Sequence, residues 1–268
     1  MLRLDGAVLC ITLLCACTSF GAANGPGSDD ADAAVAPNIG PDAGATSEAG
    51  ADARPAQFCA SQVAPRVVFC DDFEATASPL LSEARWTDTF PSDGDVQVVD
   101  VAGRSRALRT RVAYSDGSDR SVWIRKELTP IAKLPAERSR YRLSFRFSVT
   151  ESSVTYAAIG ALWFTTNEGV NLHGAALLDL GRGARPIDPS SASPAPLDAG
   201  WHDAVVVLEK HPGGWARTVT IDGTPFPAEQ ASELELAYQF DLRLGVYYAH
   251  GTDGIVDVQF DDVLVEAF

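Results

Sequence analysis

The 268-residue sequence lacks several features that define common classes of protein. Beyond the first 16 residues, no apolar run approaches the roughly 20 residues that a membrane-spanning helix needs. The catalytic signatures Gly-x-Ser-x-Gly, His-Glu-x-x-His, Gly-x-x-x-x-Gly-Lys and Cys-x-x-Cys are absent, and the four histidines do not have the spacing of zinc ligands. These absences predict no transmembrane helix in the mature chain, and they argue against the commonest hydrolases, P-loop proteins and zinc enzymes.

Cysteine is scarce, and the first cysteines lie in a segment typical of export. An early cation at Arg3, an apolar run over residues 7–14 and a small residue before Cys17 have the order of a secretory signal peptide. Residues 14–17 (LCAC) resemble the lipobox of bacterial lipoproteins, in which the cysteine after the cleavage site is acylated. We therefore expect residues 1–16 to be a signal peptide and Cys17 to carry lipid; the alternative is an ordinary cleaved signal.

The lipid would be the protein's only attachment to a membrane and would hold it in the cell envelope. Thr18 after Cys17 favours the outer membrane, by analogy with enteric sorting. Two other cysteines would leave with the signal peptide, so only Cys59 and Cys70 remain. An even remainder in an exported domain predicts one disulfide.

Large apolar side chains are almost absent from residues 17–56, which consist mainly of Ala, Gly, Asp, Ser and Pro. Such a segment cannot bury enough surface to offset its conformational entropy, so we expect an unstructured tether. Residues 57–268 have a length that β-sandwiches and barrels often occupy as one domain.

Positive charge is also scarce, because the chain carries a net charge of −15. Residues 1–56 hold seven acidic and two basic side chains, which leaves −10 on the domain. A domain with this net negative charge repels the phosphate backbone of nucleic acids. We therefore expect no nucleic-acid partner.

Helical patterns are nearly absent, and period-two alternation dominates the domain. Residues 141–149 alternate five apolar with four polar side chains, which predicts a strand with one buried face. Asp222 and Gly223 supply the chemistry of a tight hairpin turn. Further strands are expected over residues 67–73, 95–100, 108–112, 122–128, 157–164, 204–209, 218–221, 242–248 and 256–265. Many short strands joined by such turns predict two packed antiparallel sheets.

Four segments resemble strands of a known superfamily. Residues 200–205 (GWHDAV) and 218–226 (TVTIDGTPF) are similar to paired strands of concanavalin A-like and laminin-G-like jelly rolls. Residues 69–74 (FCDDFE) and 260–265 (FDDVLV) resemble the first and last strands of its bacterial members. The resemblance implies an all-β, two-sheet antiparallel β-sandwich whose end strands are neighbours. It implies no particular activity, because this fold hosts lectins, hydrolases, lyases and adhesion modules.

A second resemblance is to jelly-roll polysaccharide lyases and their motifs Arg-x-Glu-Leu, Gln-Ile-His and Lys-x-Gly-x-Tyr. The matching segments are residues 125–128 (RKEL), 171–173 (NLH) and 244–248 (LGVYY). It implies a lyase for uronate-containing glycans, in which Arg125 neutralises the uronate while His173 and Tyr247 transfer protons. The sequence departs from these motifs at Thr129, Asn171 and Leu244.

Strand parity independently selects part of the same surface. If Val122, Ile124 and Leu128 face the core, the alternate side chains of their strand point outward. Likewise, if Leu244 faces the core, its neighbours along the strand over residues 242–248 point outward. The outward residues would be Trp123, Arg125, Glu127, Arg243 and Tyr247. An aromatic ring beside charged hydrogen-bonding groups suits a sugar; the alternative is cross-strand pairing on a solvated sheet.

These observations lead to three hypotheses about function. We predict a non-catalytic, lectin-like carbohydrate-binding module that requires no cofactor. A polysaccharide lyase is the second hypothesis, and a structural surface lipoprotein without a small ligand is the third. The sequence leaves the oligomeric state open.

The paired acids near the two chain ends suggest a metal site. If the end strands are neighbours, five carboxylates converge: Asp71, Asp72, Glu74, Asp261 and Asp262. Such groups must be neutralised, paired or hydrogen-bonded, and a structural calcium ion would relieve their repulsion. The alternatives are pairing with arginine, or a β-bulge that turns the acids to water.

The remaining histidines and tryptophans have structural interpretations. His202 is expected to support a strand, and His211 and His250 to lie in solvated loops. We interpret the other tryptophans as packing or loop anchors: Trp86, Trp163, Trp201 and Trp215.

Overall fold

The structure is a computed structural model, and the parts of the chain that it describes all follow residue 57. They are residues 58–62, 65–74, 85–91, 94–102, 106–114, 120–129, 137–152, 156–166, 169–179, 183–185, 196–230, 234–250 and 254–268. The chain divides into two units, Met1–Ser47 and Glu48–Phe268, and every described residue belongs to the second. The signal peptide, Cys17 and the tether lie outside the described residues and stay predictions.

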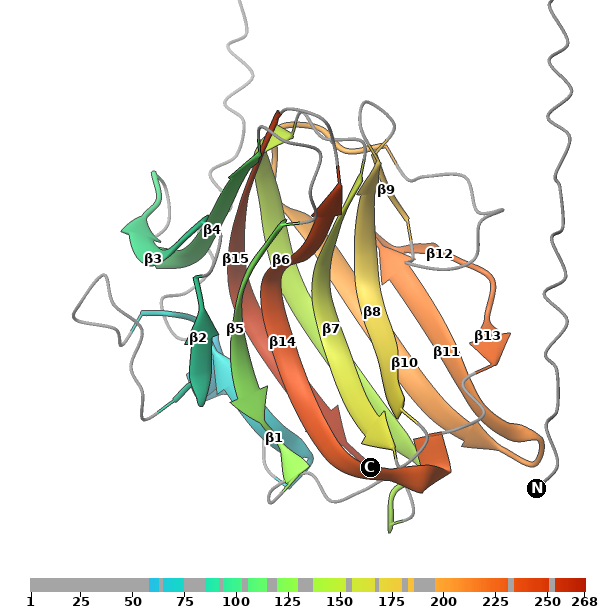
Figure 1. Cartoon of the computed structure of the whole chain (residues 1–268). Coiled ribbons are helices and arrows are strands. Elements are labelled where there is room, and N and C mark those ends of the chain that lie inside the picture. Colours follow the sequence, from blue (N-terminus) through green and yellow to red (C-terminus); the bar gives the residue numbers. More distant parts are fainter. Residues whose placement is uncertain are drawn as a thin grey trace, which may run out of the picture. The chain divides into compact units, whose positions relative to one another are not determined.

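Strands dominate the described ranges (Figure 1). They are β1 (Val67–Asp71), β2 (Asp88–Phe90), β3 (Gly94–Asp100), β4 (Arg106–Tyr114), β5 (Arg120–Glu127), β6 (Arg140–Ser152), β7 (Tyr156–Thr166), β8 (Gly169–Asp179), β9 (Gly183–Arg185), β10 (His202–His211), β11 (Gly214–Ile221), β12 (Thr224–Pro225), β13 (Glu229–Gln230), β14 (Ala237–His250) and β15 (Gly254–Ala267). Two 3-10 turns accompany them, η1 (Cys59–Ser61) and η3 (Leu234–Leu236). No helix in these ranges is long and apolar enough to cross a membrane.

The strands form two antiparallel sheets that lie face to face (Figure 1). Sheet A has the order β12-β11-β10-β6-β15-β4-β3, with β1 also paired to β15 and β13 to β11. Sheet B has the order β2-β5-β14-β7-β8-β9. The predicted two-sheet antiparallel β-sandwich is therefore confirmed.

The core between the sheets follows from the alternation in β6. Tyr141, Leu143, Phe145 and Phe147 are buried, whereas the residues between them in the first part of the strand are half-buried on the outer side. The Tyr141 ring packs edge-on against Phe164 of sheet B, with the ring centroids 5.8 Å apart. Each such side chain stabilises the fold by roughly 1.5–3 kcal/mol through burial of apolar surface.

Two glycines allow close approaches in sheet B, that of β7 to the core and that of β14 to the backbone of β5. Gly160 has φ +68, and a Cβ there would lie 2.5 Å from the Phe145 ring. Gly245 has φ +126, and a Cβ there would lie 2.6 Å from the Val122 carbonyl oxygen. Both positions coincide with irregular pairing of β14 with β7, so the path of β14 depends on them.

The two ends of the domain are joined, as the resemblance implied. β1 pairs antiparallel with β15, with Asp71 opposite Val263. Cys59 and Cys70 form the expected disulfide, which fixes η1 against β1 with a Cα–Cα distance of 5.7 Å. The predicted hairpin turn at Asp222 and Gly223 is also present, with both residues at positive φ.

Candidate functional site

The outer face of sheet B carries a stack of aromatic rings around an arginine. Phe90 stacks on Trp123 with ring centroids 3.8 Å apart. The Arg243 guanidinium lies 4.4 Å from the Trp123 ring centroid and 3.7 Å from that of Trp163. The stack therefore crosses four neighbouring strands, β2, β5, β14 and β7, and holds the guanidinium between two indole rings.

The register explains why these groups meet. Directly opposed residues of antiparallel strands share a face, and one row of them reads Asp88, Arg125, Arg243, Ala161 and Gly174 across β2, β5, β14, β7 and β8. The next row reads Glu127, Asp241, Trp163 and Leu172. Arg243 therefore lies diagonally between Trp123 and Trp163.

Carboxylates pair with the second arginine of the face. Arg125 Nε lies 3.1 Å from Asp88 Oδ2 and 3.9 Å from Asp241 Oδ2. The Asp241 side chain is 1% exposed. Burial raises the pKa of Asp241, whereas Arg125 and a hydrogen bond from Gln239 act in the opposite direction. The face thus combines two cations with a carboxyl group that holds its proton more tightly than usual.

Three of the five predicted ligand-binding residues, Trp123, Arg125 and Arg243, come together on this face. Glu127 is close enough to Asp241 to add to the rise of its pKa. Tyr247 belongs to β14, but its side chain lies outside the described residues. Phe90 and Arg243 both stack on Trp123, so this ring is one layer of a stack across the face.

Trp163, which we interpreted from the sequence as a packing or loop anchor, packs against an arginine of the site. It is half-buried on the outer face and contacts Arg243. Its parity could have shown this, because the neighbours Leu162 and Phe164 are apolar core residues. Trp86 and Trp215 are buried as expected, and buried His202 has a structural contact, with Nδ1 2.7 Å from Asp222 Oδ2.

The lyase motifs fall on three different strands. Residues 125–128 begin on β5, residues 171–173 lie on β8, and residues 244–248 lie on β14. The side chain of His173 lies outside the described residues; its backbone is in register with Leu162, a core position. The glycine of the third motif is Gly245, so the lysine position falls on Arg243, which corrects our placement of Leu244 there.

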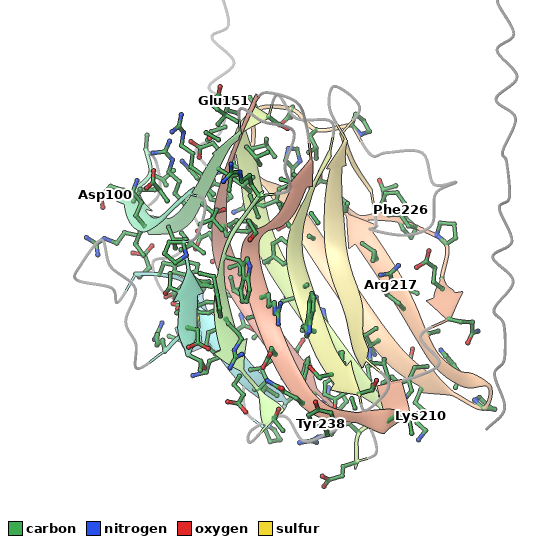
Figure 2. All side chains as sticks on the ribbon, in the orientation of Figure 1. Asp100, Glu151, Lys210, Arg217, Phe226 and Tyr238 are labelled. Atoms are coloured by element: carbon green, nitrogen blue, oxygen red, sulfur yellow. A yellow bond between two sulfur atoms is a disulfide. The ribbon has the colours of Figure 1, made fainter. Side chains whose placement is uncertain are left out.

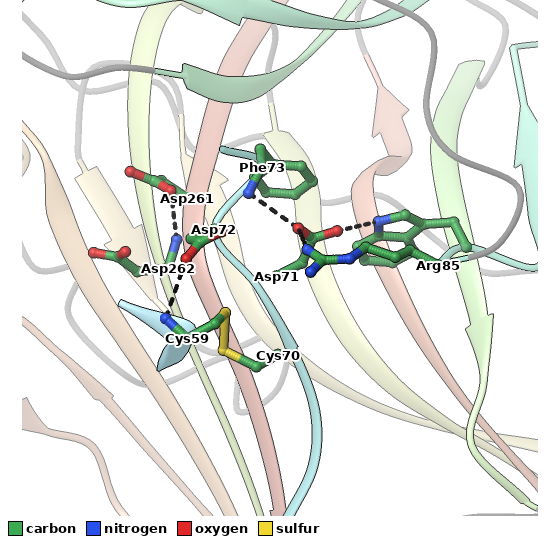
Figure 3. Close-up of polar contacts among 9 residues, drawn as sticks. Cys59, Cys70, Asp71, Asp72, Phe73, Arg85, Asp261 and Asp262 are labelled. Atoms are coloured by element: carbon green, nitrogen blue, oxygen red, sulfur yellow. Dashed lines mark hydrogen bonds and ion pairs between the residues drawn. A yellow bond between two sulfur atoms is a disulfide. The ribbon is translucent and has the colours of Figure 1, made fainter. Parts of the chain in front are cut away.

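The carboxylates at the chain ends have protein partners of their own (Figure 3). Asp71 accepts hydrogen bonds from Arg85 Nη1 at 2.6 Å, from the Trp86 indole at 2.8 Å and from the Phe73 backbone N–H at 3.0 Å. Asp71 is only 1% exposed, so these three donors offset the cost of burying its charge.

Three other acids of this group, Asp72, Glu74 and Asp261, accept hydrogen bonds from backbone N–H groups. The bonds are Cys59 N to Asp72, Arg106 N to Glu74, and Asp262 N to Asp261, at 3.1, 3.1 and 2.8 Å. A register shift lies between Asp261 and Leu264, so arginine pairing and a bulge are both present. Among the described residues, no group of three or more His, Cys, Asp or Glu could hold a metal ion. A structural calcium ion stays an untested prediction.

Comparison with solved structures supports the fold. The endo-β-1,4-glucuronan lyase of the fungus Trichoderma reesei is similar over 75% of this chain and 96% of its own, with 15% identity and a TM-score of 0.53. A sialidase matches over 75% of this chain but only 18% of its own, with 14% identity and a TM-score of 0.50. At these identities the likeness shows the two-sheet β-sandwich fold and nothing finer.

No family model matches the chain, and no curated protein matches it.

Proposed function

We propose that the protein binds uronate-containing polysaccharide on the outer face of sheet B. The observation that carries this proposal is the direct opposition of Arg125 and Arg243 on neighbouring strands of an acidic domain. Like charges in this position repel each other. Asp88 and Asp241 offset part of that repulsion at Arg125, and a ligand carboxylate would offset more of it. Guanidinium groups are suited to carboxylates because they can donate two parallel hydrogen bonds.

The surroundings of Arg243 include an aromatic group of the kind that sugars contact. Trp163 lies diagonally beside Arg243, is half-buried on the outer face, and has its ring centroid 3.7 Å from the guanidinium. A carboxylated sugar on this face would therefore meet a cation and an indole together.

Both binding alone and lyase chemistry would use this face. The shared fold of a glucuronan lyase supports the lyase better than it supports a non-catalytic module. Binding alone would require only the cations and the indole rings already described on this face. A working lyase would require Tyr247 and His173 to supply that step while Arg125 or Arg243 neutralises the uronate.

Titration calorimetry with oligoglucuronate and oligoalginate tests the binding. We expect micromolar to millimolar affinity, because the favourable contacts must first offset the free-energy cost of desolvating and ordering polar groups. Arg125→Gln should weaken binding about tenfold. Arg106→Gln is the matched control, since Arg106 pairs with Asp100 on sheet A. Equal affinity of wild type and Arg125→Gln would contradict the proposal.

Ultraviolet absorbance of unsaturated products separates the two functions. Steady product formation from polyglucuronate or alginate, abolished by Tyr247→Phe or His173→Ala, would establish the lyase. Binding that depends on Arg125 without any product would establish the non-catalytic module. Neither binding nor product would leave the structural surface lipoprotein.

A further inference from the structure

A separate hollow lies on the outer face of sheet A. It has a volume of about 360 Å³, and its walls come from η1, β6, β10 and the last part of β15. The residues that matter here are Phe58, Gln62, Ser144, Arg146, Asp203 and Asp262. The volume is at the lower end of the range for small-ligand sites, which suits one or two sugar rings.

Three features of the fold build the wall that η1 contributes. The disulfide fixes Cys59 to β1, and the Asp72 carboxylate accepts the Cys59 N–H at 3.1 Å. Gln62 Nε2 donates to the Phe58 carbonyl at 3.3 Å, which ties the turn together. The Phe58 side of the hollow is therefore held in place by one covalent and two polar links.

The opposite wall depends on a bulge in β15. Pairing with β6 shifts between Asp261 and Leu264, and Asp262 has φ +51. This left-handed conformation is unfavourable for a residue with a Cβ, although Asp tolerates it better than most. Glycine would suit the bulge better, so the bulge itself does not require a carboxylate. In Figure 3 the Asp262 carboxylate points away from Asp71 and Arg85.

The charges of the hollow are balanced. Two cations, Arg142 and Arg146, and two anions, Asp203 and Asp262, line it. Arg146 Nε lies 3.4 Å from Asp203 Oδ1, and Arg142 Nη1 lies 3.2 Å from Glu266 Oε2. A charged ligand would have to compete with these ion pairs, whereas hydroxyl groups can donate to the carboxylates and accept from the guanidinium groups at once.

From this arrangement we infer that the hollow on sheet A binds a neutral sugar unit, as a second site independent of the uronate site on sheet B. The Phe58 ring contacts the apolar face of the sugar. Asp262, Ser144 and Gln62 hydrogen-bond its hydroxyl groups. The bulge positions Asp262, and the disulfide positions Phe58.

Neutral gluco-, manno- and galacto-oligosaccharides are the probes for this site, with affinities measured by calorimetry on the full chain. Asp262→Gly should weaken binding of the best neutral sugar at least tenfold. Phe58→Ala and reduction of the disulfide should each weaken binding of the neutral sugar as well. Glu151→Gln, at the far end of β6 (Figure 2), and Arg125→Gln on sheet B should leave it unchanged.

The outcomes distinguish this site from the uronate site. No binding of any neutral probe, or equal binding by wild type and Asp262→Gly, would overturn the inference. Loss of neutral-sugar binding in Arg125→Gln would also overturn it, because the ligand would then lie on sheet B. Failure of uronate binding alone would leave this site intact.

Discussion

Arg243 lies between two indole rings, and this position gives it a structural as well as a binding role. Each cation–π contact contributes roughly 0.5–2 kcal/mol, depending on how far it is shielded from water. We predict that Arg243→Ala lowers the free energy of unfolding by about 1–3 kcal/mol in denaturant titrations. Arg106→Ala, which breaks an exposed pair with Asp100, should change it by less than about 1 kcal/mol. An Arg243→Ala variant with the same free energy of unfolding as wild type would contradict the stacked geometry.

Asp241 gives the stability a pH dependence of defined sign. Because burial raises its pKa in the folded state, the folded protein binds this proton more tightly than the unfolded chain does. The resulting stabilisation is complete below the ordinary pKa of aspartate and is lost as pH rises through the raised value. Asp241→Asn cannot ionise, so we predict that it melts above wild type at neutral pH.

Melting curves over a pH series provide the check on Asp241. The difference between Asp241→Asn and wild type should shrink as pH falls and should vanish below the ordinary pKa of aspartate. A variant that melts below wild type at neutral pH, with the deficit closing in acid, would show that the pKa is lowered instead.

At the scale of elements, the strands could be predicted because each has one buried and one outer face. The alternation over residues 141–149 matches β6, and the end strands pair as the resemblance implied. The contacts within the site could not be predicted in the same way. The two-residue period assigns a side chain to one face of a strand, but it does not give the register between strands. Parity could place Trp163 on the outer face, but its contact with Arg243 depends on the pairing of β14 with β7.

The sequence suggested a β-bulge near the paired acids but did not give its position. Only Asp71 contacts the buried Trp86, whereas Asp262 lines a hollow on the outer face. A bulge changes parity in the middle of a strand, and no turn residue marks the one in β15.

The close approach of β7 to the core gives a sharp test of element packing. Gly160→Ala should lower the free energy of unfolding by about 1–3 kcal/mol, because the new methyl group overlaps the Phe145 ring and φ is positive. Gly213→Ala is the matched control, since a Cβ there meets nothing within 4 Å. Equal stability of the two variants would contradict the described path of β7.

We propose that the whole molecule is anchored at the cell surface and that its two sheets bind different ligands. The anchor depends on Cys17, which the structure does not describe. We predict that wild type fractionates with membranes and that Cys17→Ser does not, because a single lipidated residue is the proposed attachment. Equal membrane retention of the two proteins in fractionated cells would refute lipidation at this residue.

The central claim, a uronate site on the outer face of sheet B, is tested most directly through the five tryptophans. Each indole N–H gives a separate signal in a nitrogen–proton correlation spectrum, assigned by single substitutions. On titration with oligoglucuronate, we expect the indole N–H signals of Trp123 and Trp163, which stack on Arg243, to shift. We expect no shift for the buried Trp86 and Trp215. An unchanged spectrum, or a shift confined to Trp201 next to Arg146 of sheet A, would contradict the central claim.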